Sequence, residues 1–385
     1  MRITTPRWMP GNGAMRAVAL EVLIHGPLSR SEVARRLDLS PGSLTRLSTP
    51  LLESGLLVEA GEQVDGRVGR PSQLLDVVPA SRRFIGMKLM ADEVVGVTTD
   101  LRANVLSTES RRLPDRSPDA VADVIADLAR SLAAGTPEVM ALGIGIGGFL
   151  GEHGHVLSAP FLGWEDVQLG VMIEARAGIP TIVENDLVAF TEYEHWFGAG
   201  RGLDRFAVVT LGAGVGYGLV IHDEIVRNDE FGIGLVGHWP LDPFGPVCSE
   251  GHRGCAKAVL TDTAITHAVS QALGRTVTYP EALDLAASGE PAARRVVDDA
   301  GRGLGRLLAA IANLTMPQTV ILGGEGVRLA EVATDAIKAG IAADRDPRTR
   351  PIPLTMRSGE NIEWCRGAAC VAIQSFVLGR RTAGN

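Results

Sequence analysis

The sequence predicts an α/β protein with a small winged helix-turn-helix domain at its N-terminus. Three observations support this fold class. Residues 1–80 have the order of three helices and a hairpin, and the remainder alternates strand-like apolar runs with helical runs. Within that remainder, glycines between Gly212 and Gly218 separate the apolar runs Phe206–Leu211 and Leu219–Ile221, as expected for a strand, a tight turn and a returning strand.

Length, charge and cysteine content limit the classes of protein to which this chain can belong. The chain has 385 residues, 45% of them hydrophobic, and is long enough for two or three domains. Residues 1–80 carry nine Arg and eight acidic residues, whereas the remainder carries 28 Lys or Arg and 37 acidic residues. An acidic body with a near-neutral head is compatible with a head that meets nucleic acid. Four cysteines are too few for a disulfide framework, and no apolar run spans a bilayer or forms a signal core, so we expect a cytoplasmic protein.

Three helices are predicted in the head. The first stops at Gly26-Pro27, and the second follows the N-cap Ser29. Ser40 and Pro41 are a good N-cap and a good first residue for the third. The predicted helices cover Met15–His25, Arg30–Leu37 and the residues from Pro41 to a kink or an end near Pro50.

The third helix has an apolar face and a polar face. Its apolar stripe, which we expect to be buried, consists of Leu44, Leu47 and Leu51. Small polar residues and one arginine are left for the outer face, namely Ser43, Thr45, Arg46, Ser48 and Thr49.

A hairpin follows the three helices. Its predicted strands, Leu56–Ala60 and Ser72–Val78, flank a tip rich in Gly and Arg. In a winged helix-turn-helix the third helix enters the major groove of double-stranded DNA, here with Arg46 and the small polar side chains of Ser43, Thr45 and Thr49 toward the base edges. Arg67 and Arg70 of the tip would contact phosphates or the adjacent minor groove. The alternative is a small helical protein-interaction domain with a solvated loop.

The chain resembles the ROK family of repressors, open reading frames and sugar kinases. The resemblance rests on the wing sequence from Gly69 to Val77, the triplet Glu184-Asn185-Asp186, the loop Gly212–Gly218 and the segment from Gly237 to Cys255. It covers nearly the whole chain and implies a winged helix-turn-helix followed by two ribonuclease-H-like α/β lobes of the actin and sugar-kinase type. The implied domains are a DNA-binding head at 1–80, a first lobe at 81–188 completed by a C-terminal helix at 366–385, and a second lobe at 189–365 that holds a metal-binding segment.

Kinases of this family carry an Asp-X-Gly-Gly-Thr turn that contacts phosphates and Mg²⁺. Here Lys88 stands at the Asp position, Met90 and Ala91 stand at the Gly positions, and Asp92 stands at the Thr position. Asp92 would place a negative charge against phosphates. We therefore expect no ATP binding and no catalytic residues, with a ROK-type sugar kinase as the alternative.

A sugar or sugar-derivative effector is the ligand that the resemblance implies. Asp186 and Asn185 would bind its hydroxyls, Gly148 lies in the loop that closes on the sugar, and His238 would bridge the ligand and the metal segment. Asn185 or Asp186 could instead cap a helix that runs through Glu192.

Two carboxylates that the family uses for its sugar are replaced here by Leu235 and Lys257. The loss of two acceptors and the gain of an ammonium favour an anionic ligand such as a sugar phosphate or a sugar acid. An effector-independent regulator is the alternative.

The family's metal site, one His and three Cys, holds structural Zn²⁺. His238, Cys248 and Cys255 match it, and Glu250 replaces the middle Cys. A carboxylate can bind zinc, and His252 is a second candidate for the open position. The alternative is a metal-free loop with reduced, partly buried cysteines.

These inferences together favour a transcriptional regulator, and a repressor within that class. We expect a homodimer or a dimer of dimers in which ligand binding changes the closure of the lobes. That change would alter the spacing of two heads and so the affinity for DNA.

Overall fold

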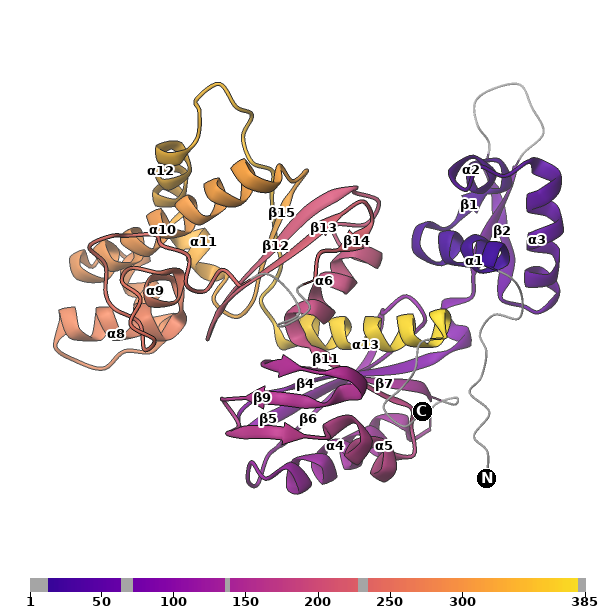
Figure 1. Cartoon of the computed structure of the whole chain (residues 1–385), viewed down its shortest axis with the longest axis horizontal. Helices are drawn as coiled ribbons and strands as arrows, with labels where there is room; N and C mark the ends of the chain where they lie inside the picture. The colour runs from indigo at the N-terminus through magenta and orange to yellow at the C-terminus, as the bar shows by residue number, and fades with distance from the viewer. Residues whose placement is uncertain (1–12, 64–71, 136–138, 228–234, 380–385) are drawn as a thin grey trace. The chain divides into compact units, whose positions relative to one another are not determined.

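The computed structural model describes residues 13–63, 72–135, 139–227 and 235–379. These residues divide into two compact units, each described separately below (Figure 1). Unit 1 comprises Met1–Gly202 and Trp364–Asn385, and unit 2 comprises Leu203–Glu363. The chain thus changes unit at 202/203 and 363/364, whereas we placed the lobe boundaries at 188/189 and 365/366. The division of unit 1 into a head and a first lobe stays a prediction.

The head contains the predicted three helices and a three-stranded antiparallel sheet of strand order β1-β3-β2. Ser29 Oγ accepts a hydrogen bond from Glu32 N and Ser40 Oγ accepts one from Ser43 N, both at 3.2 Å, so both predicted N-caps are confirmed. The elements are α1 (Gly13–His25), β1 (Leu28–Ser29), α2 (Arg30–Arg36), α3 (Pro41–Glu53), β2 (Leu57–Gln63) and β3 (Ser72–Val77).

Helix α3 buries the predicted stripe of Leu44, Leu47 and Leu51. The placement of Ser48 on the outer face was wrong, because this residue is fully buried. It lies four residues after Leu44, on the same side of the helix, and its hydroxyl donates to Thr45 O within the helix at 3.4 Å. A small polar residue that satisfies its own hydroxyl can therefore occupy a buried position.

The body of unit 1 is built on a five-stranded sheet of order β11-β7-β4-β5-β6. Strands β4, β5 and β6 are consecutive antiparallel neighbours, whereas β7 and β11 are parallel to β4. This is the strand order of a ribonuclease-H-like lobe. The strands are β4 (Arg83–Leu89), β5 (Glu93–Thr99), β6 (Val105–Arg112), β7 (Val139–Ile146) and β11 (Thr181–Asn185).

Helices cover both faces of this sheet. Helices α4 (Pro118–Ala133) and α5 (Leu169–Ala177) lie on one face, and α13 (Asn361–Leu378) lies on the other (Figure 1). Helix α6 (Asp186–Trp196) follows β11 directly. A small antiparallel sheet of β8 (Phe149–Leu150), β9 (Val156–Ala159) and β10 (Trp164–Val167) completes the body.

Helix α13 approaches the sheet at backbone distance because two strands carry glycine at the contact. A Cβ atom on Gly143 of β7 would lie 1.9 Å from Ala368 O, and one on Gly86 of β4 would lie 2.0 Å from Cys365 O. Neither strand can therefore carry a larger residue there without moving the helix.

Unit 2 repeats the strand order of unit 1 as β14-β13-β12-β15-β16. The predicted glycine turn joins β12 to β13. Helix α10 (Pro291–Thr315) packs against α7, α8, α9 and α12 and forms the centre of the helical layer. The other elements are β12 (Arg205–Leu211), β13 (Val215–Ile221), β14 (Glu224–Ile225), β15 (Val320–Gly323), β16 (Leu354–Met356), α7 (Ala256–Leu260), α8 (Asp262–Leu273), α9 (Tyr279–Ala287), α11 (Arg328–Val332) and α12 (Thr334–Asp344).

None of the helices in the described part of the chain combines the length and the apolar character that a bilayer crossing requires.

The close packing of α13 gives a direct test. Replacing Gly143 by Ala should lower the free energy of unfolding by at least about 1–3 kcal/mol, because the added methyl group meets a carbonyl oxygen of the helix backbone. Gly214→Ala is the control, since nothing lies within 4 Å of a Cβ atom at Gly214. Urea unfolding of both variants measures the difference in stability. Equal stabilities would show that α13 can move away from the sheet at little cost in free energy.

Candidate functional site

The first candidate site of unit 1 is centred on Lys88 of β4 and Asp186 at the start of α6. Lys88 Nζ forms an ion pair with Asp186 Oδ2, and the two side chains are 8% and 16% exposed. The other carboxylate oxygen, Oδ1, accepts a hydrogen bond from Leu187 N at 2.8 Å. The indole ring of Trp364 lies 4.5 Å from Lys88 Nζ and adds a cation–π contact. A buried ammonium needs a counter-charge, and Asp186 provides it.

Asn185 is held by the fold on both ends of its amide. Its Oδ1 accepts hydrogen bonds from Leu187 N at 3.0 Å and Val188 N at 3.2 Å, which confirms the helix-cap interpretation. Its Nδ2 donates to Gly148 O at 3.0 Å. Gly148 has a φ of 138°, and a Cβ there would lie 2.3 Å from Ser158 O, so this loop requires glycine. Roles for Gly148, Asn185 and Asp186 in binding a ligand stay predictions.

The turn that would hold phosphates in a kinase is an ordinary hairpin connection here. It joins β4 to β5 and is closed by a hydrogen bond from Met90 N to Glu93 O at 2.9 Å. The carbonyl of Ala91 accepts from Arg116 Nε at 2.9 Å, and Asp92 is exposed. No glycine brings the backbone close to a phosphate, and the one carboxylate at the tip would repel it.

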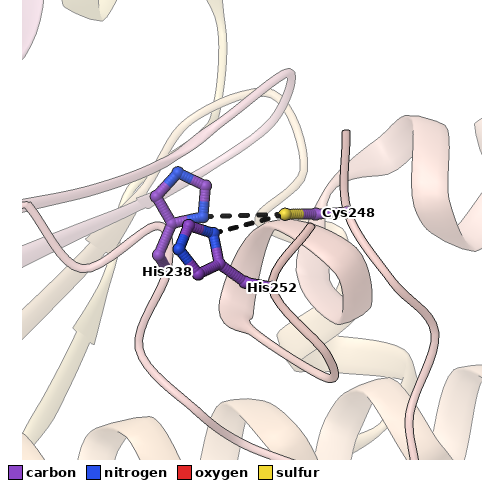
Figure 2. Close-up of side chains that lie close together, drawn as sticks. All are labelled: His238, Cys248 and His252. Atoms are coloured by element: carbon purple, nitrogen blue, oxygen red, sulfur yellow. Dashed lines mark hydrogen bonds between the residues drawn. The ribbon is translucent and has the colours of Figure 1, made fainter. Parts of the chain in front are cut away.

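The second candidate site lies in unit 2, in the segment between β14 and α7. Figure 2 shows the rings of His238 and His252 turned toward the sulfur of Cys248. Cys248 Sγ lies 3.8 Å from His238 Nδ1 and 3.6 Å from His252 Nδ1, and these three residues can offer one ligand atom each to a metal ion. Cys255 Sγ approaches the same nitrogen of His238 at 3.8 Å. Three of the predicted ligands thus form one cluster, and Cys255 lies beside it through its contact with His238.

Glu250 and Lys257, two other predicted site residues, contact each other. Lys257 Nζ lies 2.6 Å from Glu250 Oε1, and Ser249 Oγ donates to Oε2 at 2.8 Å. The hydrogen bond from Lys257, with help from that of Ser249, lowers the pKa of the Glu250 carboxyl to about 2. Leu235, at the position of a family sugar ligand, is exposed. The charge of Lys257 is therefore already balanced within unit 2.

The remaining cysteines behave as core residues. Burial raises the pKa of the Cys365 thiol to about 12 and that of the Cys370 thiol well above its ordinary value. Burial also raises the pKa of Cys255, although this residue lies beside His238 and Cys248. A buried thiol with a raised pKa is a poor nucleophile, so Cys255 is suited to a structural role and not to covalent chemistry.

The third candidate site is the outer face of α3. Thr45, Arg46 and Thr49 are exposed there, and Ser43 is half-buried. Both threonine hydroxyls donate to carbonyls of their own helix, at 3.0 Å and 2.8 Å, which leaves their oxygen lone pairs available as acceptors. Arg67 and Arg70 lie outside the described residues.

The ROK family profile matches residues 84–375. The chain belongs to the ROK family. It is 26% identical to the DNA-binding transcriptional repressor Mlc of Escherichia coli K12 over 337 residues, which is 82% of each chain. It is 27% identical to the transcriptional dual regulator NagC of the same organism over 82% of this chain and 81% of NagC.

Solved structures share the fold. A ROK family transcriptional regulator described as a homologue of the E. coli Mlc protein superposes with a TM-score of 0.79 at 23% identity, over 95% of this chain and 98% of its own. A ROK family glucokinase from Streptomyces griseus superposes with a TM-score of 0.67 at 25% identity, over 76% of this chain and 99% of its own. The first match thus extends over most of the chain, whereas the glucokinase matches three quarters of it.

The sequence analysis did not predict two contacts of the first candidate site. Lys88 was identified as a departure from the kinase turn and Asp186 as a candidate sugar ligand, but their pairing was not predicted. Trp364 was not considered. One signal was available, because a lysine among the otherwise apolar residues Phe84–Leu89 must meet a counter-charge when the strand is buried. The sequence does not say which of the 45 acidic residues supplies it.

The ion pair makes a prediction about stability. Lys88→Met should lower the free energy of unfolding by roughly 3 kcal/mol, because it leaves the largely buried Asp186 carboxylate without its counter-ion. The double variant Lys88→Met/Asp186→Asn should recover most of that loss. Lys338→Met, which breaks an exposed pair with Asp335, is the matched control and should change stability by less than about 0.5 kcal/mol. Denaturant unfolding at pH 7 compares the variants, and a stable single variant would argue against a buried pair.

Proposed function

We propose that this protein is a DNA-binding transcriptional repressor with a kinase-like body that does not transfer phosphate. The observation that carries the absence of phosphate transfer is the largely buried ion pair between Lys88 and Asp186. It lies where a phosphotransferase of this family would need a carboxylate near Mg²⁺ and a free carboxylate to accept the proton of the sugar hydroxyl. The chain instead has an ammonium at the first position, and that ammonium engages the second carboxylate.

The proposed DNA-binding element is the head. Helix α3 presents Arg46, Thr45 and Thr49 on an exposed face, next to a hairpin in the position of a wing. An arginine can donate two hydrogen bonds to a guanine edge, and threonine oxygens can accept from adenine or cytosine amino groups. Arg67 and Arg70 would add contacts to the DNA backbone. The repressor names of Mlc and of the xylose repressor of Bacillus spizizenii, 24% identical over 84% of this chain, support this function. We propose a homodimer, since operators with two half-sites need two heads.

The proposed effector is a sugar or a sugar derivative. Asp186 and Asn185 keep lone pairs that could accept from sugar hydroxyls, although each already has partners in the protein. An anionic ligand would have to displace Glu250 from Lys257, so the ammonium of Lys257 supports that subclass less than the sequence suggested. An effector-independent regulator is the second candidate, because the ion pair with Lys88 already neutralises the carboxylate that would recognise the sugar.

We further propose that His238, Cys248, His252 and Cys255 bind structural Zn²⁺. With Zn–S near 2.3 Å and Zn–N near 2.0–2.1 Å, tetrahedral ligation separates a sulfur and a nitrogen by about 3.6 Å. The separations of 3.6–3.8 Å between Cys248 Sγ and the two histidines are close to this value. Cys255 Sγ lies at the same distance from His238 Nδ1, but Cys255 is outside the group of three residues whose ligand atoms all lie within 4.8 Å of one another, so its ligation requires a small movement. His252, and not Glu250, is the proposed substitute for the third family cysteine, because Glu250 is paired with Lys257. A bound Zn²⁺ would cross-link this segment and would favour the thiolate form of both cysteines.

Fluorescence anisotropy on DNA from upstream of the gene, against scrambled DNA, tests the DNA-binding function. We expect tighter binding to the native DNA, with an affinity that falls steeply as salt is raised. Arg46→Ala should weaken specific binding by roughly tenfold or more while non-specific binding changes less. Equal binding to both DNAs would contradict the proposal, and so would steady ATP consumption with any member of a sugar panel.

Metal analysis of protein purified without chelator tests the zinc site. We expect about one zinc per chain in the wild type and in Glu250→Gln, and much less in His252→Gln. The two variants are matched because both place a neutral amide in the same loop. Cobalt substitution adds a second readout, since thiolate-to-cobalt charge transfer reports Cys248 and Cys255 directly. Zinc loss in Glu250→Gln alone would transfer the role from His252 to Glu250.

A further inference from the structure

We infer that Arg102 positions the DNA-binding head on the body of unit 1, and that helix α13 couples this contact to the Lys88–Asp186 pair. The inference rests on the proposed DNA-binding function. It concerns residues of unit 1 alone, and it assigns a role to Arg102 and Arg366, which belong to none of the candidate sites above.

Arg102 joins the body to two elements of the head. Its Nε donates to Leu23 O and its Nη2 donates to Val22 O, both at 3.0 Å, at the C-terminal end of α1. The same guanidinium forms an ion pair with Asp76 of β3, and both side chains are 17% exposed. A cation suits the last turn of a helix, where carbonyl groups carry partial negative charge. One side chain thus fixes the first helix and the second wing strand together.

The turn that carries Arg102 is itself rigid. Asp100, which is 8% exposed, accepts hydrogen bonds from Arg102 N at 2.8 Å and from Asn104 N at 3.0 Å. Asn104 Nδ2 donates to the second oxygen of the same carboxylate at 3.0 Å. Ala103 has a φ of 55°, an uncommon conformation for a residue with a side chain. A turn held in this way presents Arg102 from a fixed backbone position.

Helix α13 contacts the same turn from the other side. Arg366 Nε donates to Ala103 O at 3.1 Å, and the Arg366 guanidinium lies 4.4 Å from the ring centre of Tyr193 in α6. Two residues earlier in α13, Trp364 contacts Lys88 through its ring. Contacts therefore lead without a gap from Asp186 through Lys88, α13 and the turn to the head.

The core of unit 1 supports this route independently. Buried residues of α1, such as Val18 and Leu23, belong to the same apolar cluster as Cys370 and Ile373 of α13. Arg16 of α1 also donates to Leu378 O, at the end of α13, at 3.2 Å. Because α13 already lies at backbone distance from the sheet at Gly86 and Gly143, we expect a disturbance at Trp364 to displace the helix as a unit. Coupling of this kind passes through packed elements with few ways to move.

Hydrogen exchange tests the positioning role without DNA. Arg102→Lys keeps the charge but cannot bridge Asp76 and two carbonyls, so amides in the last turn of α1 and in β3 should exchange about tenfold faster. Arg201→Ala is the matched control, because Arg201 makes one exposed hydrogen bond to Ile24 O at the same helix end. Unchanged exchange in Arg102→Lys, or equal acceleration in both variants, would overturn the positioning role.

A double-mutant cycle tests the coupling. Lys88→Met/Asp186→Asn, which leaves no buried charge, should change specific DNA affinity by about three- to thirtyfold. The same double substitution should change it by less than about twofold when Arg102 is already Lys. Equal effects in both backgrounds would show that the two sites act independently. If the wild type does not prefer native DNA, the proposed function fails, and hydrogen exchange at α1 in the Lys88→Met/Asp186→Asn variant still decides whether the two sites communicate.

Discussion

The ion pair between Lys88 and Asp186 constrains unit 1 more than any other polar contact described here. It joins the central strand β4 to the start of α6, and its ammonium rests on Trp364 of α13. A charged side chain inside a protein is strongly destabilising without a counter-charge. The three elements must therefore keep their relative positions so that Lys88 and Asp186 stay paired. In the proposed function, the same pair occupies the two positions that a phosphotransferase would need. A lysine where the family's kinases carry an acidic residue is thus both a structural requirement of unit 1 and the basis for proposing that the body transfers no phosphate.

Much of the fold could be predicted because local signals and burial agree. Local sequence signals are sufficient to predict several elements. Examples are the N-caps Ser29 and Ser40, the glycine turn before Val215 and the apolar periodicity of α10. The short strands β8 to β10 carry no comparable signal, since their pairing depends on tertiary context. Ser48 shows that polar residues of a helix are not always exposed. Its hydroxyl forms a hydrogen bond within its own helix, so burying it costs little free energy.

The sequence indicated which residues belong to the candidate sites, but not which of their side chains contact each other. The spacing of His238, Cys248, His252 and Cys255 indicated a metal segment. The side chains of the first three do converge, and Cys255 contacts His238. Spacing could not show that Glu250 would pair with Lys257, because Glu250 reaches this residue of α7 only when the loop before the helix folds back toward it. The contact of Arg102 with Asp76 was equally hidden, since it joins residues 26 positions apart on two different substructures. Long-range polar pairs depend on the assembled fold.

Helix α13 has a consequence for the order in which the protein becomes functional during synthesis. Unit 2 is one continuous segment inserted between the two segments of unit 1, so it can fold while the end of the chain is still in the ribosome. Unit 1 cannot, because its sheet lacks one covering helix until α13 has emerged. The head would then be synthesised first, but its contacts with α13 would form last. A chain truncated before α13 would carry α3 without the support proposed to orient it, so incomplete copies are expected to compete poorly for DNA.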